Sequence, residues 1–191
     1  MTLASYLGES GEVLRATSTP TIAEKCEKAI ELIVRALSAG KPVMVCGNGG
    51  SACDAMHITG ELVGRFLSER RSFNVLCLSS NPAVLTAWSN DYSFDTVFAR
   101  QVEAHAESGG VLWGLSTSGC SVNVVKAFEQ ARQRDMCTVA MTGEGGGALA
   151  AISDVTIAAP SKRTPLIQQV HICLYHYICE SVERRLVESC V

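Results

Sequence analysis

The sequence predicts an α/β fold: a doubly wound, mostly parallel five-stranded sheet sandwiched by helices, with further helices at the N-terminus. Three observations predict it: five short apolar runs without polar alternation, helical patterns between these runs, and a length of 191 residues, which suits one domain. Runs of this kind suit strands that are covered on both faces. Ligands of such folds bind beyond the carboxyl ends of the strands, so function is sought in the loops there.

The N-terminal part, residues 1–40, is predicted to be helical. Thr19 has the position of an N-cap and Pro20 that of the first helical residue, while Thr21 and Glu24 have the spacing of a capping box. Gly40 closes this helix. The apolar residues that recur at helical spacing are Ile22, Cys26, Ile30, Ile33 and Leu37.

Five strands and three further helices follow. The predicted strands are 43–46, 75–78, 111–115, 138–141 and 155–158. The predicted helices are 52–66, 121–134, and 164 to about 188, the last opened by Pro165. No internal repeat, Pro-rich linker or low-complexity tract interrupts the chain, so we expect one domain over 1–191.

Composition excludes several classes of partner. Sixteen basic against nineteen acidic side chains leave no surplus for a nucleic-acid backbone, and no stretch approaches the ~20 apolar residues of a membrane span. The first five residues lack a secretory pattern, so we expect a cytoplasmic protein. The nine cysteines, from Cys26 to Cys190, include no C-x-x-C pair, which favours reduced and mostly buried thiols.

The loop after the first strand, residues 47–52, formally fits the dinucleotide fingerprint G-x-G-x-x-G/A. A dinucleotide site also needs an acidic residue at the end of the second strand, where this chain has Ser79, Ser80 and Asn81 instead. Glu69 has about the right spacing but precedes that strand. The loop therefore favours a smaller anionic or hydroxylated ligand.

The loop after the third strand, residues 116–121, reads Ser-Thr-Ser-Gly-Cys-Ser and runs directly into a helical pattern. Four hydroxyls and the free N–H groups of a helix N-terminus make a phosphate cradle that needs no lysine. The absence of a Gly-Lys-Ser/Thr ending disfavours a nucleotide triphosphatase. The alternative is an ordinary serine-rich turn in which Ser121 is the N-cap.

Two helices carry residues that bind metals in other proteins. His57 and Glu61 are four residues apart, so both side chains lie on one helix face and can reach a common ion, although a surface pair has the same spacing. The last predicted helix carries Gln168, His171 and His176. A buried histidine that bonds to a neighbouring carbonyl would give the same pattern.

Taken together, these residues resemble the sugar isomerase (SIS) domain family, and within it the phosphoheptose isomerases. The matching segments are 47–61, 90–91, 98–102, 116–121, 142–143 and 164–176. The resemblance implies a flavodoxin-like fold and a ketose-aldose isomerase that converts sedoheptulose 7-phosphate to D-glycero-D-manno-heptose 7-phosphate in heptose biosynthesis. It further implies a homotetramer with sites at subunit interfaces, in which residues 1–40 contribute to packing.

The resemblance also implies roles for single residues. Substrate would be contacted by Asn48, Gly49, Gly50, Ser51, Asn90, Asp91, Ser116, Thr117, Ser118, Ser121 and Gln168. One zinc ion per subunit would be bound by His57, Glu61, Gln168 and His176. Two positions depart from the family pattern: Cys120 stands where the phosphate loop usually has Asn or another polar residue, and Gln169 where a Glu usually follows the Gln. Neither departure removes a proposed ligand.

This reaction needs a base that moves a proton between two carbons of an enediol, and an electrophile for the developing oxyanion. We expect Glu61 to be the base, His176 the acid and ring-opening group, and a divalent metal the electrophile. A carboxylate on zinc loses basicity, so either Glu61 shifts when substrate arrives or His176 is the base. There are two alternatives: a non-catalytic SIS adaptor, which binds the bacterial replication initiator, and a sugar-phosphate sensor. The adaptor lacks the counterparts of Glu61 and His176.

Helix geometry bears on assembly. Gln168 and His176 are eight residues apart, about 12 Å along one continuous helix, whereas the ligands of one zinc lie within about 3–4 Å of each other. Either the helix is broken between them, or the two residues come from different subunits. We favour the second, and the resemblance implies a homotetramer of paired dimers.

Overall fold

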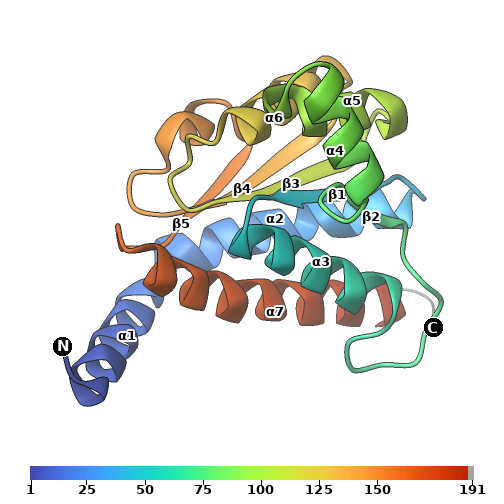
Figure 1. Cartoon of the computed structure of the whole chain (residues 1–191). Coiled ribbons are helices and arrows are strands. Elements are labelled where there is room, and N and C mark those ends of the chain that lie inside the picture. The colour runs from blue at the N-terminus through green and yellow to red at the C-terminus, as the bar shows by residue number, and fades with distance from the viewer. Residues whose placement is uncertain (189–191) are drawn as a thin grey trace.

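A computed structural model describes residues 1–188, which form a five-stranded sheet between two layers of helices (Figure 1). The strands are β1 (Val43–Gly47), β2 (Val75–Cys77), β3 (Val111–Ser116), β4 (Cys137–Thr142) and β5 (Val155–Ala158). Their order is β2-β1-β3-β4-β5 and every neighbouring pair is parallel. This confirms the predicted fold class, with the flavodoxin-like strand order whose switch point lies between β1 and β3.

The helices divide between the two faces of the sheet. They are α1 (Leu3–Thr17), α2 (Pro20–Ser38), α3 (Gly50–Val63), α4 (Pro82–Asp91), α5 (Val97–His105), α6 (Val122–Gln133) and α7 (Thr164–Glu188), with short 3₁₀ turns η1 (Phe94–Thr96) and η2 (Gly147–Ala151). Figure 1 shows α2, α3 and α7 on one face, α4, α5 and α6 on the other, and α1 projecting from the body. The apolar spacing of the sequence predicts neither α4 nor α5.

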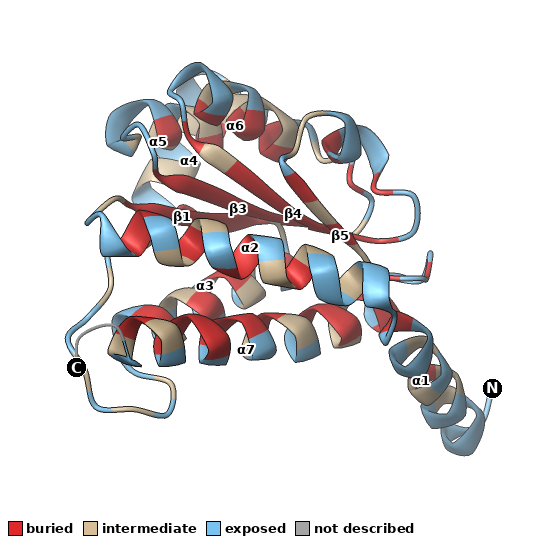
Figure 2. Cartoon of the chain, turned by 180° about the vertical axis from the view of Figure 1, so that it is seen from behind, coloured by how far each residue is buried: buried red, intermediate tan, exposed pale blue. Residues whose placement is uncertain are grey.

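Burial on both faces explains why the strands lack polar alternation. Val43 and Val45 pack into the core under α2, α3 and α7, whereas Met44 and Cys46 pack into the core under α5 and α6. Figure 2 shows the sheet and the helix faces turned toward it as buried. In β3, Gly114 is required by close packing, because a Cβ there would collide with the ring of Phe128. Because helices cover both faces of the sheet, side chains that contact a ligand must lie at the ends of the strands.

The ends of α2 test the predicted capping. Thr19 is the N-cap, its hydroxyl accepts the N–H of Ile22 at 3.2 Å, and Pro20 is the first helical residue, as predicted. The Thr21–Glu24 capping box is wrong, because the cap lies before Pro20 and Thr21 is already inside the first turn. Gly40 follows the helix with φ +71°, a conformation that favours glycine.

Helix α3 differs slightly from its predicted bounds of 52–66. It begins at Gly50, directly after β1, and ends at Val63 because Gly64 takes the C-cap position. The loop 64–70 that follows is held by Glu183 of α7.

Helix α7 is continuous over its 25 residues, so the broken-helix alternative is wrong. It runs beside α3 in the same direction: Gln168 lies over Gly50, Tyr175 reaches His57, and Glu183 binds Phe66. The two helices thus bring the metal-ligating residue types of both segments to one seam.

Within residues 1–188, no helix is long and apolar enough to cross a membrane. The eight cysteines in this range are free; four are buried, Cys137 is half-buried, and Cys53, Cys120 and Cys173 are exposed. Burial of these thiols is less general than the sequence predicts. Cys190 lies outside the described residues.

Candidate active site

The loop between β3 and α6 folds into a compact turn of hydroxyl groups at the helix N-terminus. The Oγ atoms of Ser116 and Ser121 are 2.9 Å apart, and Ser118 Oγ accepts the N–H of Cys120 at 3.1 Å. Ser121 is the N-cap of α6 by position, but its hydroxyl makes no capping bond. The N–H groups at the start of α6 are therefore not blocked by this side chain, which is what a phosphate cradle requires.

The segment 146–149 packs against this turn. Gly119 has φ +65°, and a Cβ there would collide with the carbonyl oxygen of Gly146. Gly147, with φ +57°, would likewise collide with the carbonyl oxygen of Ser118. The N–H of Leu149 donates to the carbonyl of Gly119 at 3.0 Å. Glycine is thus needed on both loops for their backbones to approach, and the approach fixes the shape of the turn.

The loop after β1 is anchored by two residues from other elements. The side-chain amides of Asn48 and Asn123 exchange two hydrogen bonds of 2.8 Å each, and Asn123 is buried. The Ser79 hydroxyl accepts the N–H of Gly47 and donates to its carbonyl. Gly49 precedes α3 with φ +55°. These bonds hold the loop in place beside the turn at 116–121, at the switch point of the sheet.

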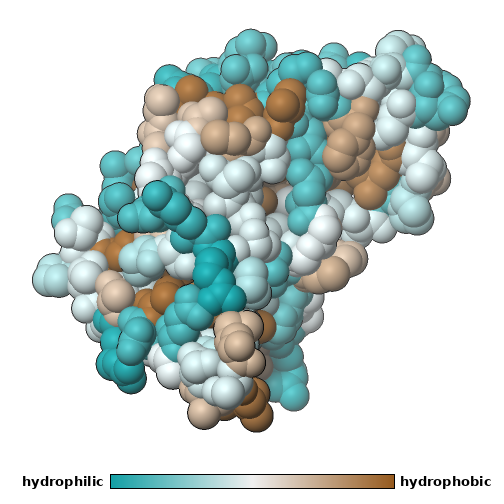
Figure 3. Space-filling model, turned by 60° about the vertical axis from the view of Figure 1, so that its left-hand side comes forward, coloured by the Kyte–Doolittle hydropathy of each residue, from teal (hydrophilic) through white to brown (hydrophobic). Residues whose placement is uncertain are grey.

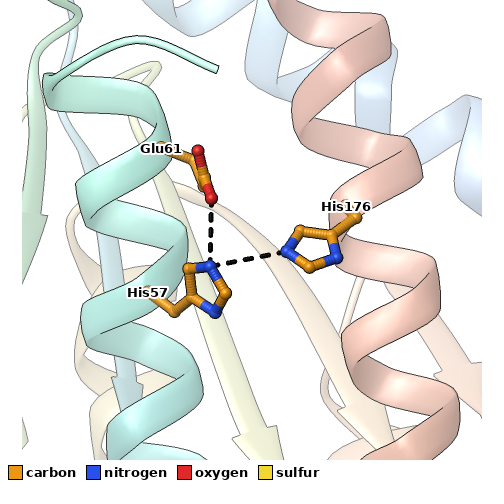
Figure 4. Close-up of side chains that lie close together, drawn as sticks. All are labelled: His57, Glu61 and His176. Carbon is orange, nitrogen blue, oxygen red and sulfur yellow. Dashed lines mark hydrogen bonds and ion pairs between the residues drawn. The ribbon is translucent and has the colours of Figure 1, made fainter. Parts of the chain in front are cut away.

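His57, Glu61 and His176 form a group of side chains that could hold a metal ion within one chain. Figure 4 shows all three pointing toward one another, the first two from α3 and the third from α7. His57 Nε2 lies 3.0 Å from Glu61 Oε1 and 3.4 Å from His176 Nε2, and one ligand atom from each residue lies within 4.8 Å of the others. The ligands of a tetrahedral zinc are about 3.3 Å apart when each lies about 2.0 Å from the ion. The donor set and its spacing therefore fit a divalent metal.

Aromatic packing and one buried hydroxyl hold the His57 ring. Tyr175 is fully buried, and its Oη lies 2.9 Å from His57 Nδ1, on the side of the ring away from Glu61. Burial, together with the nearby Asp54 carboxyl, raises the pKa of Tyr175, so its hydroxyl keeps its proton. The rings of Tyr175 and Phe66 also pack against His176, at centroid distances of 4.9 and 5.8 Å. Both histidines are thereby oriented before any ligand binds.

A buried ion pair fixes the loop that follows α3. Glu183 is 2% exposed and accepts the N–H groups of Phe66, Leu67 and Ser68 at 2.7–2.9 Å, and Arg70 Nε at 3.0 Å. Burial alone would raise the pKa of Glu183, but these N–H donors and the Arg70 charge lower it overall. Arg70 also donates to the carbonyl of Glu61 at 2.8 Å. The ion pair therefore secures the backbone of Glu61.

Comparison with known proteins agrees with this architecture. Residues 5–143 match the family model of the SIS domain. The chain belongs to the SIS domain family. A phosphoheptose isomerase of Crocosphaera subtropica is 47% identical to this SIS domain protein, over 91% of this chain and 88% of its own.

Two solved structures are also close to this SIS domain. The phosphoheptose isomerase of Neisseria gonorrhoeae has a TM-score of 0.89 at 38% identity and covers 94% of this chain and 97% of its own. That of Francisella tularensis has a TM-score of 0.90 at 32% identity and covers 96% of this chain and 100% of its own.

The other predicted site residues of this SIS domain are more dispersed. Gln168 lies against Gly50 at the start of α3, about two helical turns from His176, so it does not join the metal group within one chain. Asn90 and Asp91 lie exposed at the end of α4 and bond to each other at 2.9 Å. Thr117 lies in the loop at 116–121, and Ser51 is buried in the first turn of α3. Their roles in substrate binding stay predictions.

His171 belongs to the core of the SIS domain. It is fully buried, and its Nε2 lies 3.0 Å from the carbonyl oxygen of Thr142 at the end of β4. Burial lowers its pKa to about 4, only partly offset by that bond. It matches the alternative of a buried histidine that bonds to a carbonyl.

The sequence patterns do not reveal the residues that hold His57 and Glu61 in place. Asp54 shares a helix face with His57 and Glu61, at positions i, i+3 and i+7, and this spacing could have revealed it. Tyr175 and Glu183 carried no comparable signal, because only the alignment of α7 with α3 brings them to the site.

Proposed function

We propose that this chain is a phosphoheptose isomerase that converts sedoheptulose 7-phosphate into D-glycero-D-manno-heptose 7-phosphate in heptose biosynthesis. The observation that carries the chemistry is the convergence of a carboxylate, Glu61, and an imidazole, His176, at one end of the α3–α7 seam. The similarity to phosphoheptose isomerases over most of the chain supports the substrate class.

Isomerisation moves the carbonyl of the open-chain sugar from C2 to C1. In our proposal Glu61 removes a proton from C1 while His176 donates a proton to the C2 oxygen, which gives an enediol. The C1 hydroxyl then returns its proton to His176, and Glu61 delivers its proton to C2. Atoms and charges balance, and both side chains end in their starting states. His176 also serves as the acid that opens the sugar ring.

We further propose that the metal is zinc, one per subunit, held by His57, Glu61 and His176. The spacing of their ligand atoms supports this choice. Bound there, zinc would polarise the sugar oxygens on which negative charge develops. Glu61 can act as a base, and His176 as an acid, only while the side chain is not ligating, so the release of both from the metal on substrate binding belongs to the proposal.

The phosphate of the substrate is assigned to the loop at 116–121. Its hydroxyls and the N-terminal N–H groups of α6 supply donors without a cationic side chain, and the dipole of α6 favours an anion. The sugar hydroxyls are assigned to Asn48, Gly49, Gly50 and Ser51 after β1, and to Asn90, Asp91 and Gln168. Cys120 is exposed in the phosphate loop, so it adds a thiol at this position.

The assembly we propose is a homotetramer with sites at subunit interfaces. An apolar groove between α1, α2 and α7 is lined by Leu14, Ile22, Val170 and Leu174, and α1 exposes further leucines. Figure 3 brings the α1 side forward and shows apolar side chains among polar ones in its lower half. Residues 1–40 would pack between subunits of this single-domain chain, and Gln168 of a neighbouring subunit would complete the metal site.

Two alternatives remain in other classes: an adaptor that binds the bacterial replication initiator, and a sugar-phosphate sensor. Neither an adaptor nor a sensor needs a base and an acid beside a metal-ligating histidine. The group of His57, Glu61 and His176 between α3 and α7 therefore favours the enzyme. The free thiols of the described cysteines support the cytoplasm as its compartment.

The test is the substitution Glu61→Gln, which keeps the shape of the side chain and removes the proton acceptor. We expect kcat for sedoheptulose 7-phosphate to fall about 10²–10⁴-fold with substrate affinity largely retained. Glu129→Gln is the matched control, because Glu129 is exposed on α6. A Glu61→Gln protein with kcat within threefold of wild type would transfer the role of base to His176.

A further inference from the structure

The buried hydroxyl of Tyr175 has two polar neighbours. One is His57 Nδ1, 2.9 Å from Tyr175 Oη, and the other is the Asp54 carboxyl, which interacts with the same hydroxyl. The remaining Asp54 oxygen, Oδ2, is buried without a hydrogen-bond partner among residues 1–188. A phenol in a fully buried position needs partners for its oxygen and its hydrogen, and the chain supplies one for each.

The directions of these hydrogen bonds follow from what each group can donate. An Asp54 carboxylate can only accept, so the Tyr175 hydroxyl donates to it. The Tyr175 oxygen must then accept, and the donor is N–H at Nδ1 of His57. A neutral imidazole carries one proton, so Nε2 of His57 keeps a lone pair. That atom is the one that faces Glu61 and His176.

We propose that Asp54 and Tyr175 form a hydrogen-bond relay that holds His57 in the Nδ1–H tautomer, so that its Nε2 lone pair is presented to a divalent cation. Both are positioning residues, since they act through His57. This inference rests on the metal role proposed above. Metal-ligating histidines commonly donate their second N–H to a carboxylate or carbonyl, and here a tyrosine lies between the histidine and the carboxylate.

Without the relay, the other tautomer has a ready acceptor. Glu61 Oε1 lies 3.0 Å from His57 Nε2 and can accept a proton held there. An Nε2–H bond to Glu61 would occupy both ligand atoms and turn an N–H toward the metal position. With the relay, Nε2 of His57 is free to bind a cation. Without it, Nε2–H can bond to Glu61 and the site cannot bind the cation in the same way.

The first experiment measures zinc affinity by competition with a chromophoric chelator, on metal-stripped protein without substrate. Tyr175→Phe keeps the buried ring and removes only the hydroxyl, and we expect it to bind zinc about 10–100-fold more weakly than wild type. Tyr177→Phe is the control, because it makes the same change on α7 at an exposed position; we expect affinity within twofold of wild type.

A second substitution tests whether Asp54 acts through Tyr175. Asp54→Asn should weaken zinc binding in the same direction, because an amide can donate to the Tyr175 oxygen and reverse the relay. The double variant should bind zinc no more weakly than Tyr175→Phe alone, since the two changes remove one effect. Additive losses would contradict the relay.

The ¹⁵N shifts of the imidazole nitrogens report the tautomer directly in metal-free protein, with His57 identified by the signal absent from a His57→Ala variant. We expect His57 to be protonated at Nδ1 in wild type and to gain the Nε2–H form in Tyr175→Phe. Protonation at Nε2 in wild type, or unchanged zinc affinity in Tyr175→Phe, would overturn the relay alone. Wild-type protein that binds no zinc would overturn the proposed metal site together with the relay.

Discussion

His171 makes the stability of this fold depend on pH in a way that one substitution removes. Its folded pKa is about 4, because burial disfavours the charged ring, whereas an exposed histidine titrates near 6.5. The folded pKa is depressed, so the contribution to stability is fully present above about pH 6.5 and is lost as the pH falls toward 4. Linkage with these two values gives a loss of about 2 kcal/mol from this group between about pH 7.5 and about pH 5.

The perturbation is His171→Gln, whose amide can still donate to the Thr142 carbonyl but does not titrate. The free energy of unfolding is measured by urea denaturation at both pH values, at one protein concentration and with a metal chelator present. We expect wild type to lose about 2 kcal/mol more than the variant between the two pH values. Equal losses in both proteins would refute the assignment of His171 as a neutral buried group.

Three further predictions concern the loop, the ion pair and the assembly. Ser118→Ala should weaken binding of sedoheptulose 7-phosphate by roughly 1.5–3 kcal/mol and leave the affinity for free sedoheptulose little changed in calorimetric titrations; equal losses would place the phosphate elsewhere. Glu183→Gln should lower the free energy of unfolding by roughly 3–5 kcal/mol, because it leaves a buried arginine unpaired, and a cost below about 1 kcal/mol in urea would contradict this. Mixed oligomers of Gln168→Ala and His176→Ala chains should regain turnover if Gln168 comes from a neighbouring subunit. Mixed oligomers of Glu61→Gln and His176→Ala chains should not, because Glu61 and His176 belong to the same group within one chain. Absence of recovery in the first mixture would refute the shared site.

The fold was predictable because its signals are local. The five apolar runs, the cap at Thr19 and Pro20, and Gly40 each depend on a few neighbouring residues. The ends of the strands agree with prediction to within one residue. The missed helices α4 and α5 have only 10 and 9 residues, so each offers few repeats of an apolar pattern. Their hydroxyl-rich starts also resemble turns.

The site was predictable only in part, for a physical reason. His57 and Glu61 share one helix face, so their pairing follows from spacing, but the partnership with His176 depends on how α7 lies against α3. That alignment also separates Gln168 from the group and brings Tyr175 to His57. Contacts between distant segments leave no periodic trace in a single sequence, so the relay and the Glu183 ion pair emerged only from the structure.

Isomerisation of a ketose phosphate through an enediol is tested most directly by NMR of sedoheptulose 7-phosphate incubated with the zinc-loaded protein in D₂O. We expect an aldose 7-phosphate to form and solvent deuterium to enter at C2, because the proton passes through an exchangeable side chain. A ketose that remains unchanged, in the presence of folded protein with zinc bound, would contradict it.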